Sequence, residues 1–434
     1  MAVPEAATAE TRGRRRALAA VVGVVFVDLL GFGVVIPILP FYVRSFAVSD
    51  AVIGLLAASY SLMQFLAAPT LGRLSDERGR RPVILLSLAG SVVAWIVFGV
   101  AGELGAIAGT TAGLATLFCS RMLAGAMGGN IATANAYIAD VTPEAQRAGA
   151  LGLLGASFSL GFIFGPALGG LAASDPVVVA ADAVLPAFVP TTQYSLPSFL
   201  AAGLSLLALL LALLFLKEPD RRRGASARRT IVDTFRDALA DPSIRGLVIA
   251  FFLVSLAFSG VQVMFIPFAA DIYGYGATQV ALFLSYIGVL GALNQGVLVG
   301  RLSKVVPPVR LAVVGAALLA VALAMLPFSP ELGRLLLPWV DAVSPELAWL
   351  LIAGAVLSLG NGLLGVSLST LVSTGASAET QGVAFGVTQG AGSLGRTVGP
   401  PLMGVLYVAT YWSPFVVGAL VVVPVLGLLA RRAR

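Results

Sequence analysis

The sequence predicts an all-α membrane protein with twelve transmembrane helices in two six-helix bundles that repeat one another. Three observations support this fold class. The 434 residues are 58% hydrophobic and only 11% charged, with a mean hydropathy of +0.97, so a soluble core could not cover the apolar surface. Apolar stretches long enough to cross a bilayer recur twelve times along the chain. Motifs of the first half return in the second half at matching places.

Each predicted span holds about 20 mainly apolar residues, the length that crosses the hydrocarbon core. The first six spans lie at 17–43, 51–71, 82–101, 114–138, 148–172 and 197–216. The second six lie at 246–268, 277–300, 309–328, 347–372, 381–408 and 411–430. Proline and glycine inside several spans are compatible with this assignment, because neighbouring helices satisfy freed backbone groups in a membrane.

Arginine and lysine predict the orientation. They cluster in the N-terminal tail, the loops on the same side and the C-terminal tail, whereas the opposite loops carry only Arg44 and Arg334. The positive-inside rule therefore predicts a multi-pass protein of the cell membrane with both termini in the cytoplasm. The predicted parts are the tail 1–16, the first bundle 17–216, the linker 217–245, the second bundle 246–430 and the tail 431–434.

The linker is the longest charged stretch and divides the spans six and six. Within it, Ile231, Phe235 and Leu239 recur at four-residue spacing. This favours an amphipathic helix on the membrane surface, with a solvated loop as the alternative. The basic residues flank membrane spans and are not interleaved with aromatic residues, so we expect no nucleic-acid partner.

The rarest residue types exclude several kinds of chemistry. Cys119 is the single cysteine, so neither an intramolecular disulfide nor a cysteine-based metal site is expected. The chain has no histidine, which removes the commonest metal ligand, general base and neutral-pH proton carrier. No phosphate-binding loop of the Walker type is present. We therefore expect no metal, no other cofactor and no enzyme activity, and any proton chemistry must use carboxylates.

The halves of the chain repeat each other. Gly-Arg-Leu-Ser follows span two at 72–75 and span eight at 300–303. In span five, Ser-Leu-Gly at 159–161 precedes Gly-Pro at 165–166, and the same pattern returns 234 residues later in span eleven. A duplicated six-span unit predicts two bundles about a central axis, substrate binding near the midplane and alternating access.

The loop between spans two and three, at 72–82, carries the sharpest motif. Its glycines permit a tight backbone turn, and its aspartate can bond a basic side chain or a helix N-terminus. This pattern resembles the signature loop of the major facilitator superfamily, which implies a gating role; the alternative is a simple topology signal. The residues concerned are Gly72, Asp76, Arg78, Gly79, Arg80 and Arg81. Asp140 and Arg147, after span four, are expected to form one network with Asp76, or else to be independently solvated.

Span five carries a row of small residues, which let membrane helices pack backbone to backbone. The row resembles the antiporter motif of the same superfamily, which implies a conformational role, and generic glycine packing is the alternative. Its residues are Gly155, Gly161, Gly165, Pro166, Gly169 and Gly170, with Gly399 and Pro400 as counterparts in span eleven.

Span one contains Asp28, about 12 residues past Arg16 and so roughly 18 Å into the bilayer at 1.5 Å per residue. A carboxylate at that depth is a functional hypothesis by default, with a structural ion pair to an arginine as the alternative. The surrounding residues 26–40 resemble the first helix of twelve-span drug:proton antiporters, tetracycline pumps included. Arg121, followed by Gly125 in span four, resembles the superfamily's arginine-plus-glycine motif.

Polar side chains inside the other spans are candidates for a substrate cavity or, equally, for bonds between helices. They are Asn130, Asn135, Gln262, Asn294, Gln295, Asn361, Gln389 and Arg396.

The resemblance implies a secondary active transporter that exports amphipathic small molecules or drugs in exchange for protons. Asp28 would bind proton and substrate in competition, and Arg121 would hold the deprotonated carboxylate. The expected partners are a small-molecule substrate, protons and the lipid bilayer, with the protein a monomer. Spans seven to twelve lack the deep titratable residues of tetracycline pumps, which favours the wider multidrug class. The alternative is a proton-coupled symporter or uniporter for a small nutrient or metabolite, such as an anion held by Arg121 and Arg396.

Overall fold

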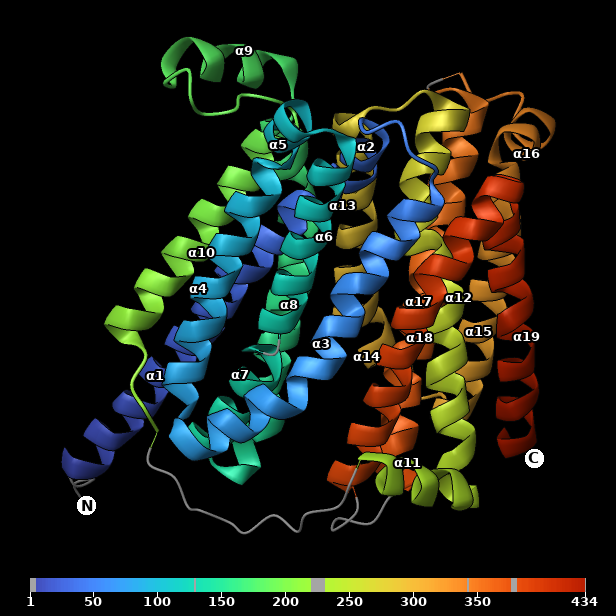
Figure 1. The fold of residues 1–434 in the computed structure, drawn as a ribbon. Coiled ribbons are helices and arrows are strands. Elements are labelled where there is room, and N and C mark those ends of the chain that lie inside the picture. Colours follow the sequence, from blue (N-terminus) through green and yellow to red (C-terminus); the bar gives the residue numbers. More distant parts are fainter. Residues whose placement is uncertain (1–4, 129, 220–230, 342, 376–380, 434) are drawn as a thin grey trace. The chain divides into compact units, whose positions relative to one another are not determined.

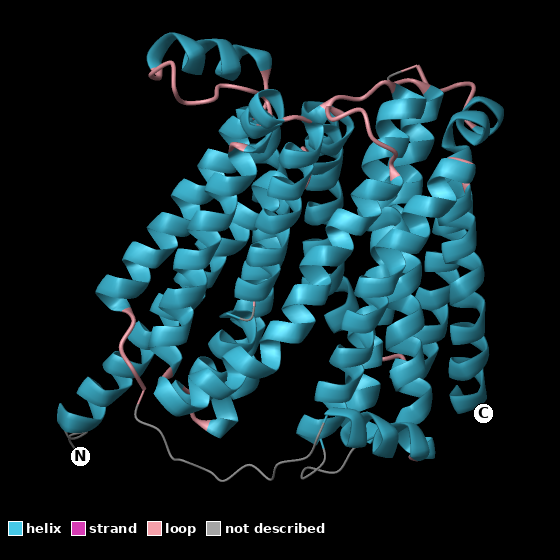
Figure 2. Cartoon of the chain, viewed as in Figure 1, coloured by secondary structure: helices cyan, strands magenta, loops and turns pink. Residues whose placement is uncertain are grey.

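The computed structural model describes residues 5–128, 130–219, 231–341, 343–375 and 381–433, and these form helices joined by short connections (Figure 1). None of the described residues lies in a β-strand (Figure 2). The predicted all-α fold class is confirmed. Within the described ranges, ten helical segments are long and apolar enough to cross a membrane.

The two remaining predicted spans are the fourth and the eleventh. The fourth is divided into α6 (Thr110–Met127) and α7 (Asn130–Val141), and the eleventh is α18 (Gln381–Ala409). Each contains an arginine well inside, Arg121 and Arg396, which lowers the mean hydropathy of any window that includes it. Among the described residues, ten of the twelve predicted spans therefore have the length and composition of a membrane helix.

The chain divides into two compact units. Unit 1 contains Met1–Ala47, Ser59–Ala225 and Tyr275–Ser285, and unit 2 contains Val48–Ala58, Ser226–Gly274 and Tyr286–Arg434. Each unit thus holds most of one predicted bundle and a short piece from the other half of the chain. The helices α3 (Ala51–Arg78) and α13 (Ala277–Leu293) contribute residues to both units.

Unit 1 is built around α1, which packs against α8 and α10, while α4 packs against α10 and α6. Besides α6, α7 and part of α3, its helices are α1 (Glu5–Val35), α2 (Leu39–Arg44), α4 (Arg80–Gly99), α5 (Ala101–Ala108), α8 (Glu144–Ala172), α9 (Asp175–Val184) and α10 (Ser195–Phe215). The predicted first span is not continuous, because α1 ends at Val35 and α2 begins at Leu39, on either side of Pro37. Proline lacks the backbone N–H that would continue the helix.

The helix α10 buries small side chains and exposes large apolar ones, as membrane helices do. Ala201, Ala208 and Ala212 are buried against neighbouring helices, whereas Leu210 and Leu214 are exposed. Small residues permit close helix packing, and lipid chains are an apolar solvent for large side chains. The predicted membrane span is therefore consistent with the way α10 distributes its side chains.

Unit 2 repeats this packing scheme. Its helix α12 packs against α18 and α19, and α15 packs against α17 and α19. The elements are α11 (Ile231–Ala240), α12 (Pro242–Tyr273), a π-helical segment at Asn294–Val299, α14 (Gly300–Leu302), α15 (Pro308–Met325), α16 (Ser329–Leu336), α17 (Pro345–Gly375), α18 and α19 (Ser413–Ala433). The repeat read from the sequence motifs is therefore also a repeat of helix contacts.

The predicted linker helix forms as α11. Its Phe235 and Ala238 pack against Val248 of α12 and against Val387 and Ala391 of α18. The apolar face predicted to lie on the membrane surface is therefore covered at these positions by protein. A solvated loop, the alternative, is wrong for residues 231–240.

Candidate functional site

The helix α6 carries Arg121 into an aromatic cage within unit 1. Its guanidinium carbon lies 4.6 Å from the ring centroid of Tyr60 and 5.8 Å from those of Phe32 and Trp95. Only 6% of the Arg121 surface is exposed. The contact is close because Gly125, one turn later, packs on α3: a Cβ built at Gly125 would strike the backbone of Tyr60.

The cage contains no acidic partner. Among the described residues, Arg121 makes no hydrogen bond or ion pair, and its Nε is buried without a hydrogen-bond partner. Three rings compensate part of the cost of burying the charge, since a desolvated cation–π contact contributes about 2 kcal/mol. The guanidinium is therefore held by faces of aromatic rings while its N–H edges remain unmatched.

Asp28, the predicted proton-coupling residue, lies half-buried on α1 and accepts a hydrogen bond from Ser205 of α10 at 3.2 Å. Phe32, four residues later on α1, contacts the guanidinium of Arg121. The structure thus places Asp28 one helical turn from Phe32, the residue of α1 that contacts Arg121, but does not join Asp28 and Arg121 as an ion pair. Among the described residues, the predicted ion pair between the Asp28 carboxylate and Arg121 is not formed.

The glycines of span five line a tight contact between α8 and α1. A Cβ at Gly165 would lie 2.6 Å from the Cα of Gly33, and one at Gly161 would lie 3.0 Å from the Cβ of Leu29. A Cβ at Gly169 would strike the carbonyl of Val34. At Gly165 and Gly169 the opposing atoms belong to the backbone, so only glycine permits the approach there. Pro166 lies inside the helix beside this contact.

The end of this motif meets α13 within unit 1. A Cβ at Gly170 would strike the side chain of Ala281, and Thr278 donates a hydrogen bond to the carbonyl of Gly170 at 3.2 Å. Gly155 differs from the other members, because a Cβ built there meets nothing within 4 Å. The tight contact therefore begins at Gly161 and not at the start of the predicted motif.

The counterpart in unit 2 is the contact between α18 and α12. A Cβ at Gly399 would strike the side chain of Ser259, and the carbonyl of Pro400 lies against Gly54 at the start of α3. Arg396, on the same helix, donates a hydrogen bond from Nη2 to Ser393 Oγ at 3.0 Å.

The signature loop forms a tight turn that the sequence predicted. Gly79 has a φ of +125°, a conformation that side-chain-bearing residues rarely adopt. Arg80 donates from Nη1 to Asp76 at 2.6 Å and from Nε to Asp140 at 3.0 Å. The predicted neighbours Asp76 and Asp140 therefore meet through Arg80.

The other members of the predicted gating set are placed around this turn. Arg81 donates from Nη2 to the carbonyl of Leu213 on α10 at 3.0 Å. Arg78 is exposed, and Gly72 has open space where a Cβ would lie. The side chain of Arg147, the predicted third member of the network, lies outside the described part of the structure.

Glu218 is a residue of this region that the sequence reasoning missed. Its two carboxylate oxygens each accept a hydrogen bond, from the backbone N–H of Arg80 and of Arg81, at 2.8 Å. A carboxylate at a helix N-terminus satisfies orphan N–H groups and matches the helix dipole. The only sequence signal is an acid just after span six, at a separation of 138 residues from Arg80.

The polar cavity candidates are distributed over both units. The π-helical segment begins at Asn294, whose side chain donates a hydrogen bond to Ser358 Oγ at 3.4 Å. The neighbouring Gln295 lies against Gly362 of α17. Asn361 is half-buried. The side chain of Asn130 lies outside the described residues. The exposed candidates are Asn135, Gln262, Gln295 and Gln389.

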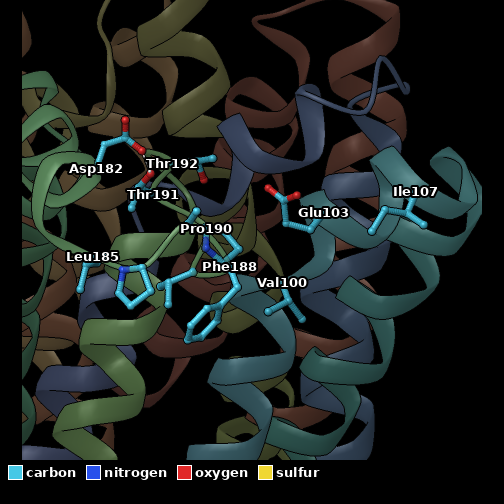
Figure 3. A pocket seen from close by; sticks show the side chains of 12 residues that line it. Val100, Glu103, Ile107, Asp182, Leu185, Phe188, Pro190, Thr191 and Thr192 are labelled. Atoms are coloured by element: carbon cyan, nitrogen blue, oxygen red, sulfur yellow. Dashed lines mark hydrogen bonds between the residues drawn. The ribbon is translucent and has the colours of Figure 1, made fainter.

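A cavity of about 450 Å³ lies at the end of unit 1 that carries α5 and α9 (Figure 3). Glu103, Asp182 and Phe188 line it, and Thr191 donates a hydrogen bond to Asp182 at 2.6 Å. None of the predicted site residues lines this cavity. In the described part of the chain, no group of three or more acidic or cysteine side chains is placed to hold a metal ion.

Comparison with known proteins gives a consistent result. Residues 21–400 match the Major Facilitator Superfamily. The chain is 30% identical over 427 residues to "Tetracycline resistance protein, class C" of Escherichia coli, covering 96% of this chain and 97% of that protein. It is 28% identical over 394 residues to "Multidrug resistance protein 1" of Bacillus subtilis (strain 168), covering 90% and 89%. The crystal structure of the human organic anion transporter MFSD10 (TETRAN) shares the fold, with a TM-score of 0.66, 24% identity and coverage of 96% and 99%.

Proposed function

Because the chain belongs to the Major Facilitator Superfamily, we propose that it exports amphipathic small molecules, drugs included, from the cell in exchange for protons by alternating access. The observation that carries this proposal is the match over nearly the whole chain to proteins named for resistance to tetracycline and to multiple drugs. The glycine contact between α1 and α8 supports it, because that contact contains the motif that resembles antiporters. The protein would reside in the cell membrane with both termini in the cytoplasm, as a monomer.

Asp28 is the proposed proton-coupling group. The chain has no histidine, and arginine does not release protons in proteins. Asp28 lies half-buried on α1, next to Ser205 of α10. Proton and substrate would compete for this carboxylate, so that loading one releases the other.

The placement of Asp28 suggests how titration reaches the rest of the protein. The same helix α1 is in backbone contact with α8 one to six residues beyond Asp28, from Leu29 to Val34. Packed helices shift as units, since their contacts are bistable and not continuously deformable. A change of charge on Asp28 would therefore be transmitted to the α8 contact through α1, with the Asp76–Arg80–Asp140 cluster as a cytoplasmic latch.

The test is transport by purified protein in liposomes with an acidic interior. Ethidium and tetracycline are added outside, and the internal pH is followed with a trapped pH-sensitive dye. We expect substrate accumulation that raises the internal pH and that a protonophore abolishes. Proton flow in the same direction as the substrate would favour the symporter alternative, and accumulation without any proton movement would refute proton coupling.

A further inference from the structure

The unpaired charge of Arg121 points to a ligand. Arg121 is buried, with 6% of the residue's surface exposed, yet the described residues offer its guanidinium ring faces and no acceptor. We propose that Arg121 and the rings of Phe32, Tyr60 and Trp95 form the binding site for an oxyanion carried by an aromatic substrate. This inference rests on the proposed function and names the chemical class of its substrate.

The geometry of the cage matches an oxyanion. Arginine carries five N–H donors in a planar fork that matches a carboxylate or a related planar oxyanion. The ring centroids lie 4.6 to 5.8 Å from the guanidinium carbon, and among the described residues no oxygen accepts a hydrogen bond from its donors. Nε, one of these donors, has no hydrogen-bond partner. An oxyanion would satisfy such donors with charge-assisted hydrogen bonds.

The surroundings explain why the protein does not supply this oxyanion itself. The helices α4 and α6 contain no acidic residue, and the acidic residues of α3 and α8 lie only at helix ends, at 76–77 and 144. Asp28, the remaining carboxylate of this region, accepts a hydrogen bond from Ser205. The cage is therefore built to place a cation among aromatic rings without an internal counter-ion.

The aromatic part of the substrate has a surface to meet. Phe32 and Tyr60 are half-buried, and Phe162 of α8, which contacts Phe32 edge to face at 6.3 Å, is 40% exposed. Trp95, the third ring of the cage, is buried. The approach to Arg121 is therefore along the half-buried rings of α1 and α3, which can stack on an aromatic ligand.

The position of Asp28 extends the inference to a second charge. Asp28 precedes Phe32 by four residues, which is about 6 Å along a helix. A substrate with an oxyanion at Arg121 would therefore have its cationic group near Asp28, one helical turn along α1 from the ring that contacts Arg121. Protons would compete with its cationic end, as antiport requires, while Arg121 would hold the other end. The preferred substrates are therefore aromatic zwitterions.

The test compares two dyes that differ at one group. Rhodamine 110 has a cationic xanthene and a free carboxylate, and rhodamine 123 is its methyl ester. Equilibrium binding to the purified full-length protein is measured by fluorescence anisotropy. We expect rhodamine 110 to bind at least about tenfold more tightly, since a tenfold ratio is only about 1.4 kcal/mol. Equal binding of the two dyes, or tighter binding of the ester, overturns the proposal without any variant being needed.

Variants then assign the preference to Arg121. Arg121→Gln should reduce the ratio to within about threefold because it weakens binding of the acid much more than binding of the ester. Arg121→Lys should keep part of the ratio because the charge remains without the planar fork. Cys119→Ser, an exposed position on the same helix, is the matched control and should keep the full ratio. An unchanged ratio in well-folded Arg121→Gln protein refutes the assignment.

The same preparation separates this inference from the proposed function. If ethidium moves against a pH gradient but the two rhodamines bind equally, only the oxyanion site is wrong. If rhodamine 110 binds preferentially but no substrate moves with proton exchange, the proposed transport mechanism is wrong and the site remains.

Discussion

The contact between α1 and α8 allows a sharp test at Gly165. A Cβ added there would lie 2.6 Å from the Cα of Gly33 and 2.8 Å from its carbonyl carbon, whereas carbon atoms in favourable contact are about 3.5–4.0 Å apart. Both opposing atoms belong to the backbone, so no side-chain rotation relieves the overlap. The helices must separate by about 1 Å, and overpacking of this kind costs about 1–3 kcal/mol.

A matched control lies on the same helix. A Cβ at Gly152 meets nothing within 4 Å. Alanine is more favourable than glycine inside a helix by about 0.8–1.0 kcal/mol. Gly152→Ala should therefore stabilise the protein slightly, while the same substitution at Gly165 destabilises it. Both substitutions gain this helix propensity, so the two variants should differ by the overpacking cost alone, about 1–3 kcal/mol.

The assay combines stability with function. Thermal denaturation of the purified variants in detergent reports the difference in stability, and proton-driven ethidium transport in liposomes reports the helix movement. We expect Gly165→Ala to denature at a lower temperature and to transport more slowly, and Gly165→Leu to insert in the membrane but not to transport. If Gly165→Ala is as stable and as active as Gly152→Ala, α1 and α8 do not pack at backbone distance.

Four further outcomes are expected. Asp28→Asn should abolish accumulation against a gradient but retain downhill exchange; normal proton-coupled accumulation by this variant would remove Asp28 from the mechanism. Asp76→Asn, which weakens the bond to Arg80 at the membrane edge, should slow transport while equilibrium dye binding stays within a few-fold; a large loss of binding at unchanged exchange rates would contradict this. Glu218→Gln should destabilise the N-terminus of α4 by about 1–2 kcal/mol, measured by denaturation, because it removes a charged cap from two backbone N–H groups. A tag at either terminus should be accessible only after the cells are permeabilised, and labelling of intact cells would reverse the proposed orientation.

Much of the architecture is readable from the chain alone because it depends on contiguous segments. Hydropathy over about 20 residues predicts membrane helices wherever they occur. The spacing of Gly161, Gly165 and Gly169 predicts a small-residue face on one helix, since residues four apart lie on the same side. The motif at 72–82 predicts a tight turn, and Gly79 has the positive φ that such a turn uses. The helix break at Pro37 has an equally local cause, although the predicted first span ran through it.

The tertiary structure decided which groups meet across the chain. Arg121 was predicted to face Asp28, but it lies among Phe32, Tyr60 and Trp95, which come from three other helices. Glu218 caps α4 although it lies 138 residues from Arg80 in the chain. The apolar residues Phe235 and Ala238 of α11 pack against α12 and α18, whereas the sequence predicted contact with the membrane surface. Hydropathy and spacing describe the faces of single helices, and they contain no information on which face of another helix lies opposite. That choice depends on how all the helices pack together, so the partners of a buried charge emerge only from the folded chain.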